Sequence, residues 1–499
     1  MKYSIFSLFL LTIGGAEGFT TTTTPSFRIA RPVTTLAPLP SSISSCQRKI
    51  SLKDAASSSS SLCMSSEAAA EGDAEKEVGG GTATIPNEIF NLVKGIVGAG
   101  VLSLPAGIAA YGNAPSAVIP ATILIALIGV ISGYGFSLIG RVCSYTGATS
   151  YRDAWDKSVG PNSSWIPAAS CTFKTSCAIL AYSMILADTF QALLTTVGFS
   201  TITRSQSLFG VTGLFLLPLC LLKNLSSLAP FSLLGIIGML YTAVAMAMRY
   251  LGKAYHVPTG GKFLADVPAN LQPSFGTTGA TGVLQPSSFI LISMLSTAYM
   301  AHFNAPKFYT ELKNNTLERY NKVVSSSFAI SIGIFALVAG LGFLTFGSAC
   351  SGLILNNYST KDAVMSFSRV AVAVSIVFSY PLAFVGARDG ILDVFNVSQS
   401  KRSNALLNKV TVAILSAITA LALKVKDLSF VLSFAGATLG NALIYVYPAL
   451  MFRKAVKNMG DDASKGLKVE VKFAMLSAIL GVVMGGIGSV MAVKNLLAG

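Results

Sequence analysis

Charged residues and histidine are scarce in this chain of 499 residues. Only 11% of the residues are charged and two are histidines, whereas soluble domains carry about 25% charged residues. The sequence contains no HExxH or GxSxG pattern and no set of His and Cys residues at metal-binding spacing. The seven cysteines form no CxxC pair. These absences argue against an enzyme, a metal site and a disulfide framework, and we expect no cofactor.

Apolar residues make up 52% of the chain and gather in long runs separated by short polar loops. An apolar run of about 20 residues is long enough to cross a bilayer as a helix. We therefore predict an all-α membrane protein, embedded in the lipid bilayer, with about eleven transmembrane helices. The predicted helices lie at 88–111, 115–140, 166–197, 208–222, 227–250, 285–305, 323–347, 364–386, 407–424, 428–450 and 473–495.

The net charge of +15 lies mostly in loops beside the apolar runs. Because the Lys and Arg residues form no basic patch interleaved with aromatic residues, nucleic acid is not an expected partner. With the N-terminal tail on the inner side, the loops on that side hold about twice as many Lys and Arg residues as the opposite loops. This asymmetry favours an odd number of helices and an N-terminus on the cytoplasm-like side.

The N-terminal region has the composition of a targeting sequence. Lys2 precedes an apolar run at 5–13 and a series of small residues, which is typical of a signal peptide over 1–18, or alternatively of an uncleaved anchor. Residues 19–66 are rich in Ser, Thr and Pro and nearly free of acids, as in a transit peptide, and 67–86 form an acidic linker before the membrane domain at 87–497. The junction at 16–19 resembles the bipartite plastid presequence of diatoms. This resemblance implies a plastid envelope, with a vacuolar or other endomembrane as the alternative.

The first predicted helix contains the run Gly98, Ala99 and Gly100, followed by Pro105. Irregular backbone inside a membrane is tolerated only where protein or a water-filled cavity satisfies its polar groups. Free amides at such a break can bind a carboxylate. Close packing between helices is the alternative explanation of these small residues. On spacing alone, both interpretations stay open.

Several segments, in order along the chain, resemble motifs of the amino acid/auxin permease family, which includes vesicular, sodium-coupled and proton-coupled amino acid transporters. The resemblance extends over about 85–495 and implies a LeuT-like fold, in which helices 1–5 and 6–10 form inverted repeats and an eleventh helix follows. It further implies an amino acid substrate bound between breaks in helices 1 and 6. The segments are 91–105, 149–153, 181–188, 218–232, 301–313, 342–347, 354–358, 379–382 and 434–440.

In helix 6 we place the break at 301–306, where Pro306 weakens the helical hydrogen bonding. With Gly98 to Gly100, the candidate substrate-binding residues there are His302 and Asn304. Histidine titrates in the range that suits proton coupling. A neutral His302, hydrogen-bonded within the bundle, is the alternative.

Ionisable residues at membrane depth are candidates for ion coupling. Lys94 lies one turn before the first break. The family resemblance associates a lysine at this place with proton coupling rather than sodium coupling. The alternative is that the Lys94 side chain extends to the membrane interface. Asp188 in helix 3 pairs either with a transported cation or with Lys174 or a nearby hydroxyl group. Ser375 and Ser379 in helix 8 correspond to the region where related folds bind sodium, or else bond to a preceding carbonyl.

These features favour a secondary active transporter that moves a neutral amino acid together with protons by alternating access. A sodium-coupled amino acid symporter and an amino acid sensor that does not translocate its ligand are the alternatives. The sequence leaves open which amino acid is carried, the direction of net flux and the oligomeric state.

Overall fold

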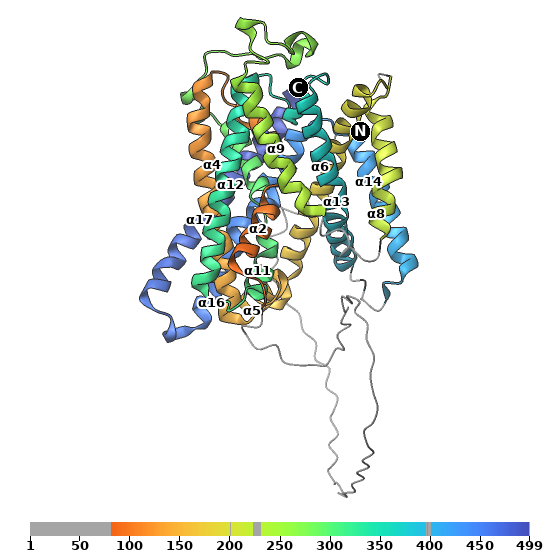
Figure 1. Ribbon diagram of the computed structural model, residues 1–499. Coiled ribbons are helices and arrows are strands. Elements are labelled where there is room, and N and C mark those ends of the chain that lie inside the picture. The colour runs from red at the N-terminus through yellow and green to blue at the C-terminus, as the bar shows by residue number, and fades with distance from the viewer. Residues whose placement is uncertain (1–80, 200, 223–230, 396, 398–400, 499) are drawn as a thin grey trace, which may run out of the picture. The chain divides into compact units, whose positions relative to one another are not determined.

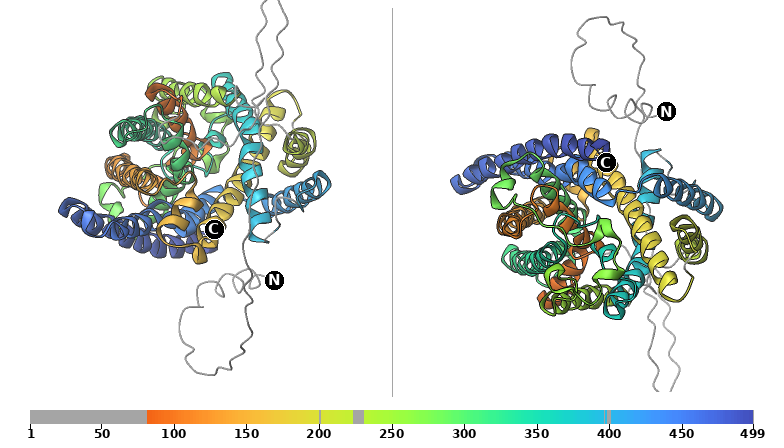
Figure 2. Two further views of the ribbon diagram at one scale, coloured as in Figure 1. Left: turned by 90° about the horizontal axis from the view of Figure 1, so that it is seen from below. Right: turned by 90° about the horizontal axis from the view of Figure 1, so that it is seen from above.

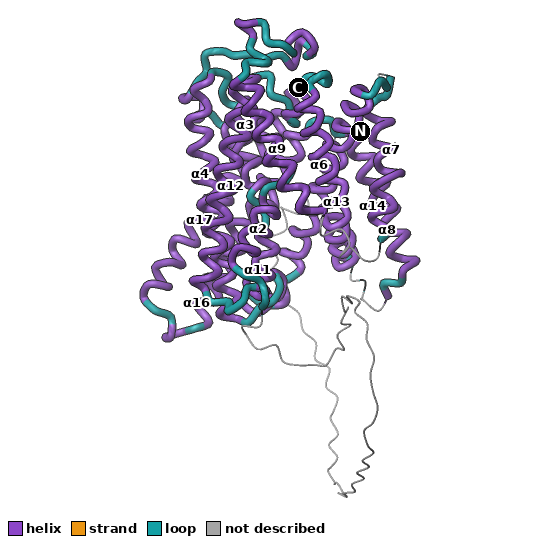
Figure 3. Tube along the Cα trace, in the orientation of Figure 1, coloured by secondary structure: helices purple, strands orange, loops and turns teal. Residues whose placement is uncertain are grey.

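The computed structural model describes residues 81–199, 201–222, 231–395, 397 and 401–498, with the side chains of 231–234 and 498 excepted. The helices run side by side, and the loops gather mainly at the two ends of the bundle (Figure 1, Figure 3). The predicted signal peptide, the transit peptide and most of the acidic linker lie outside the described residues.

Each of the eleven predicted apolar runs corresponds to helical structure. Eight helices are long and apolar enough to cross a membrane, or nine if the bent pair Ile85–Ile96 and Ala99–Ala109 is counted as one span, among the described residues. The two remaining runs correspond to α9 and to the broken helix formed by α10 and α11. The first half contains α2 (Ile85–Ile96), η1 (Ala99–Ser103), α3 (Leu104–Ala109), α4 (Val118–Thr146), α5 (Tyr151–Ser158), α6 (Trp165–Thr196), α7 (Arg204–Val211), η4 (Thr212–Leu216), α8 (Leu217–Leu221) and α9 (Phe231–Leu251).

The second half repeats this order of helices. It contains α10 (Ser288–Ala298), η10 (His302–Asn304), α11 (Ala305–Glu311), α12 (Leu317–Phe346), η11 (Ile354–Asn357), α13 (Ala363–Val394), α14 (Asn404–Lys424), α15 (Leu428–Ala435), η13 (Gly436–Gly440), η14 (Ala442–Val446) and α16 (Tyr447–Asn458), and α17 (Lys465–Ala498) follows. Short helices η7 (Leu264–Asp266) and η8 (Ala269–Leu271) lie in the long connection between α9 and α10.

Several spans of the first half pack against their counterparts five spans later. The second span, α4, packs against the seventh, α12; the third, α6, packs against the eighth, α13; and α7 with α8 packs against α14. Viewed end-on, α14 and α17 lie at opposite edges of the bundle (Figure 2). This pairing is the arrangement expected when two repeats of five helices are related by inversion.

The helices extend beyond the apolar runs from which they were predicted. α13 continues to Val394 and α17 begins at Lys465, although the sequence placed 387–406 and 451–472 in loops. Hydropathy identifies only the part of a helix that lies in the hydrocarbon core of the membrane. The backbone hydrogen bonds of the helix continue through charged turns into the interface. Side-chain caps then fix the ends of several helices; Thr316, for example, accepts a hydrogen bond from the Arg319 amide at the start of α12.

Candidate functional site

The first membrane helix is interrupted at the predicted position. The α-helical ladder of α2 ends with the hydrogen bond from Val97 N to Val93 O, 2.7 Å, and α2 meets the next helical segment at an angle of 43°. The first bond after the break joins Val101 N to Gly98 O, 3.2 Å. The amides of Ala99 and Gly100 therefore have no acceptor within the new helical segment, as is usual for the first amides of a helix.

Open space borders this break. A Cβ atom added to Gly98 or to Gly100 would meet no other atom within 4 Å. Close packing between helices does not explain these two glycines, because packed glycines elsewhere in the chain leave no room for a Cβ atom. Ser103, at the end of η1, adds a buried hydroxyl group without a hydrogen-bond partner. No feature of the sequence had singled this residue out. The break thus combines unused backbone donors, a polar hydroxyl group and free volume.

The sixth membrane helix is also broken, but earlier than predicted. α10 ends at Ala298, and Tyr299, Met300 and Ala301 lie outside regular helix before η10 begins. Pro306 does not interrupt a helix; it occupies the first turn of α11. Proline is well accommodated there, because the first amides of a helix have no partner within it. Pro105 holds the same place at the start of α3, so the two broken helices resume in the same way.

His302 points toward α4 rather than into open space. It is 0% exposed, and its Nε2 atom lies 2.8 Å from the carbonyl oxygen of Ser132, to which it donates a hydrogen bond. The ring contacts Phe136 edge-on, with 5.6 Å between centroids. These contacts hold the His302 ring within the bundle. Asn304 is half-buried at the end of η10, directly before α11.

A third irregular segment lies in the tenth membrane helix, within the motif 434–440. Thr438 has φ −87° and ψ −115°, which departs from helical geometry. The preceding α15 is tied to the sixth helix, since Thr297 Oγ1 donates to the carbonyl oxygen of Leu432 at 2.6 Å. η13 packs against α10 and α6. The sequence marked this segment only through the family resemblance and did not predict a break.

The two lysines closest to the breaks take different positions. Lys94 is half-buried in the last turn of α2, where the carbonyl ends of a helix favour a cation. Lys174 reaches from α6 toward the other break, and its Nζ atom lies 4.5 Å from the centroid of the Phe303 ring. A cation over an aromatic face is a stabilising arrangement. Lys174 was considered from the sequence only as a partner for Asp188.

Asp188 pairs with a different cation. Its Oδ1 atom lies 2.5 Å from Arg204 Nε, and its Oδ2 atom accepts a hydrogen bond from Asn356 Nδ2 at 3.1 Å. Of the alternatives weighed for Asp188, a pair with Lys174 does not form, because fourteen positions along one helix separate the two residues by about 21 Å. Asp188 therefore belongs to a polar cluster at the end of α6 and not to the breaks.

Ser375 and Ser379 are half-buried on α13. The Ser375 Oγ atom lies against Gly235 of α9, where an added Cβ atom would approach it to 2.5 Å. The structure thus brings Ser375 next to the fifth membrane helix. No group of three or more His, Cys, Asp or Glu side chains that could hold a metal ion occurs in the described part of the chain.

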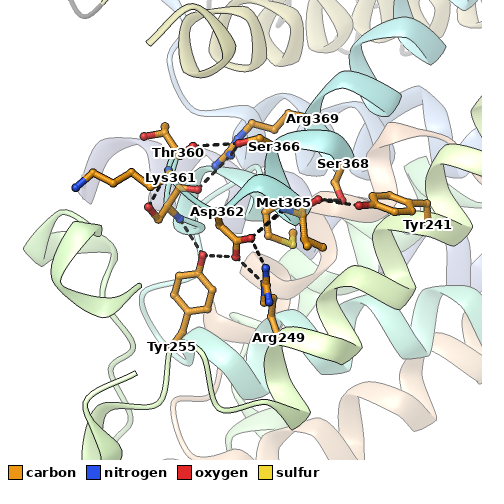
Figure 4. A network of polar contacts seen from close by, with 12 residues as sticks. Tyr241, Arg249, Tyr255, Thr360, Lys361, Asp362, Met365, Ser366, Ser368 and Arg369 are labelled. Carbon is orange, nitrogen blue, oxygen red and sulfur yellow. Dashed lines mark hydrogen bonds and ion pairs between the residues drawn. The ribbon is translucent and has the colours of Figure 1, made fainter. Parts of the chain in front are cut away.

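A buried carboxylate joins the end of α9 to the start of α13 (Figure 4). Asp362 is 0% exposed and accepts hydrogen bonds from Arg249 at 2.7 and 2.8 Å and from the Tyr255 hydroxyl at 2.9 Å. It also caps α13 through the amides of Val364 and Met365. Two-pronged pairing with a guanidinium gives both strength and fixed geometry. No local pattern indicates this network, because Asp362 lies more than 100 residues from both Arg249 and Tyr255.

A comparison of the sequence with known families agrees with this geometry. A model of the transmembrane amino acid transporter protein family matches residues 81–493, which include the breaks in the first, sixth and tenth membrane helices. The chain belongs to this family. Amino acid transporter AVT6E of Arabidopsis thaliana is 24% identical over 422 residues, which cover 81% of each chain. Sodium-coupled neutral amino acid symporter 2 of Danio rerio is 24% identical over 400 residues, which cover 77% of this chain and 78% of the symporter.

The fold of this family member also has a counterpart among solved structures. Mhp1, in an inward-facing conformation, superposes with a TM-score of 0.52 over 84% of this chain and 91% of Mhp1, at 11% sequence identity. This likeness confirms the predicted LeuT-like architecture of a multi-pass membrane protein.

Proposed function

We propose that this transporter carries a neutral amino acid and protons together across its membrane by alternating access. The observation that carries the proposal is the break at Gly98 to Gly100, where unused amide donors border open space. Amide donors at the start of a helical segment favour a negative group. The α-carboxylate is common to all amino acids, so this contact would select the class and leave the side chain to the surrounding residues.

Proton coupling is supported by the position of Lys94 at the end of α2, directly before the break. A fixed ammonium group there would take the place of a bound cation. Buried lysines exchange protons more readily than exposed ones. Asp188 is a weaker candidate for proton coupling, because its carboxylate already accepts hydrogen bonds from Arg204 and Asn356.

Sodium coupling is the second candidate, because several relatives are named as sodium-coupled transporters or symporters. In this candidate, Ser375, which lies against Gly235 of α9, would supply one oxygen atom to the sodium ion. Ser379 lies one helical turn further along α13.

Uptake of a panel of labelled amino acids into liposomes that contain the full chain would test both candidates. We expect an inward proton gradient to accelerate uptake of neutral amino acids, with no effect of a sodium gradient. Acceleration by sodium alone would replace the first candidate by the second. Saturable binding without net uptake would show that the chain is a sensor and would refute both.

The plastid envelope remains our proposal for the location of the protein. It rests on the signal peptide and transit peptide read from residues 1–66 and on the junction at 16–19. A fluorescent protein fused behind residues 1–66 should enter the plastid of a diatom cell. Retention in the secretory pathway or delivery to the vacuole would refute the plastid location, while leaving the transport activity untouched.

A further inference from the structure

A polar pocket of about 460 Å³ lies beyond the break, at the ends of the helices. Three cationic and two anionic side chains line it, from the end of α6, the start of α7, η7, α13 and the connection between α14 and α15: Asp188, Arg204, Asp266, Arg369 and Lys426. Its volume is within the range of small-molecule sites. All of these elements meet at the end of the bundle opposite the predicted inner loops.

Both carboxylates of the pocket are already paired. Asp188 binds Arg204, and Asp266 binds Lys361 at 2.5 Å. None of the ion pairs among the described residues includes Arg369 or Lys426. The pocket therefore carries a surplus of positive charge.

Arg369 is the deepest of these cations. It is 1% exposed, and its two terminal nitrogens donate to neutral groups, among them the carbonyl oxygens of Leu355 at 2.8 Å and Tyr358 at 2.6 Å. Its Nε atom has no hydrogen-bond partner, and neither does Nη2 of Arg204. Figure 4 shows the Arg369 side chain beside Ser366 and Thr360, away from the Asp362 carboxylate. Burying a cation among neutral acceptors is costly unless an anion arrives to compensate it.

We propose that this pocket is a second subsite, which attracts the carboxylate of the amino acid on its way to or from the break. The inference rests on the proposed transport function and adds a binding step to it. η11, which carries Asn356 of the pocket, packs directly against η1 of the break. A substrate that leaves the pocket would thus meet the segment whose amides are unused. The surplus charge recognises the carboxylate, and the open volume tolerates different side chains.

Lys426 provides the cleanest test, because it is exposed and its replacement disturbs no packed contact. Lys424, two residues earlier, is equally exposed but does not line the pocket. The full chain is reconstituted in liposomes, and vesicles with the pocket outward are selected by the protease accessibility of a terminal tag. We expect Lys426→Gln to raise the KM for the amino acid about three-fold and Lys426→Glu about ten-fold, with kcat unchanged. Lys424→Gln and Lys424→Glu should leave KM unchanged.

Two further measurements identify the ligand. Raising the ionic strength should increase the KM of the unmodified chain and remove its advantage over Lys426→Gln, since salt screens exposed charges. The amide of the same amino acid, which lacks the carboxylate, should inhibit the unmodified chain and Lys426→Gln equally.

Identical KM values in the Lys426 and Lys424 series would overturn the proposal, as would an effect on kcat alone. If the Lys426 effect vanished when chloride was replaced by methanesulfonate, the pocket would hold a free inorganic anion, and the carboxylate proposal would also fall. A chain that takes up no amino acid at all would instead refute the transport function.

Discussion

Gly98 allows the proposed binding function of the break to be tested separately from its role in folding. Its backbone has φ −110° and ψ −174°, an extended conformation open to any residue, and an added Cβ atom would meet nothing within 4 Å. Replacing glycine by alanine at such a position narrows the unfolded ensemble. We therefore expect Gly98→Ala to fold normally and to gain about 0.4–1 kcal/mol in stability.

A larger side chain at the same place should obstruct the substrate. The leucine of Gly98→Leu would extend into the open space where we expect the amino acid carboxylate. Overfilling a site of this kind costs about 1–3 kcal/mol, which corresponds to an apparent affinity about five- to 150-fold weaker. Uptake into liposomes gives the KM, and thermal unfolding in detergent gives the stability.

Two other glycines serve as controls. Gly333 lies on the exposed face of α12 and also has no neighbour within 4 Å of an added Cβ atom, so Gly333→Leu should change neither transport nor stability much. At Gly107 an added Cβ atom would meet Leu291 Cδ1 at 2.9 Å and Leu291 Cα at 3.2 Å, so Gly107→Ala should lower stability. A well-folded Gly98→Leu chain with unchanged KM would refute the site.

The other predictions concern charge. Asp362→Asn should lower the free energy of unfolding by about 2–3 kcal/mol, because it leaves the partly buried Arg249 unpaired. Asp266→Asn breaks a pair with exposed Lys361 and should lower it by under about 1 kcal/mol. Equal losses in thermal unfolding would contradict this. Lys94→Thr should weaken proton-driven uptake and make uptake respond to a sodium gradient; an unaltered ion dependence would argue against coupling at Lys94. Burial and the Asp362 carboxylate raise the pKa of Tyr255 above 10.0. The Tyr255 hydroxyl group therefore stabilises the fold fully below that pH, and this contribution is lost as the pH rises above it. In Tyr255→Phe, stability should fall less steeply with rising alkaline pH.

Glycine and proline marked the break in the first helix, and the family resemblance favoured a break over close packing. The break in the sixth helix has no such signal at Tyr299 to Ala301. There tertiary contacts hold the interrupted segment in place: the Tyr299 hydroxyl donates to the carbonyl oxygen of Ile125 at 3.1 Å, and its ring packs on Phe335 with centroids 4.6 Å apart. Contacts between distant segments cannot be predicted from a local pattern. The sequence analysis therefore placed the break at Pro306, which is recognisable in the sequence.

The polar cluster around Asp188 was missed for a related reason. Sequence reasoning weighed the nearest cation on the same helix, but a helix rises only about 1.5 Å per residue and carries distant positions far apart. The partner that pairs with Asp188, Arg204, lies at the start of the next helix, and Asn356 comes from the other repeat. Only the fold brings these three side chains together.

The two repeats therefore share a backbone plan but differ in chemistry. Both broken helices resume at a proline in the first turn, Pro105 and Pro306. At the first break, however, Gly98 leaves open space, whereas at the second break the His302 ring is fully buried against α4 and its aromatic neighbours. Space for a ligand thus exists at the first break, where side chains are absent. The second break is filled by large side chains. We therefore propose that the first break recognises the substrate and that the second break supports the bundle around it.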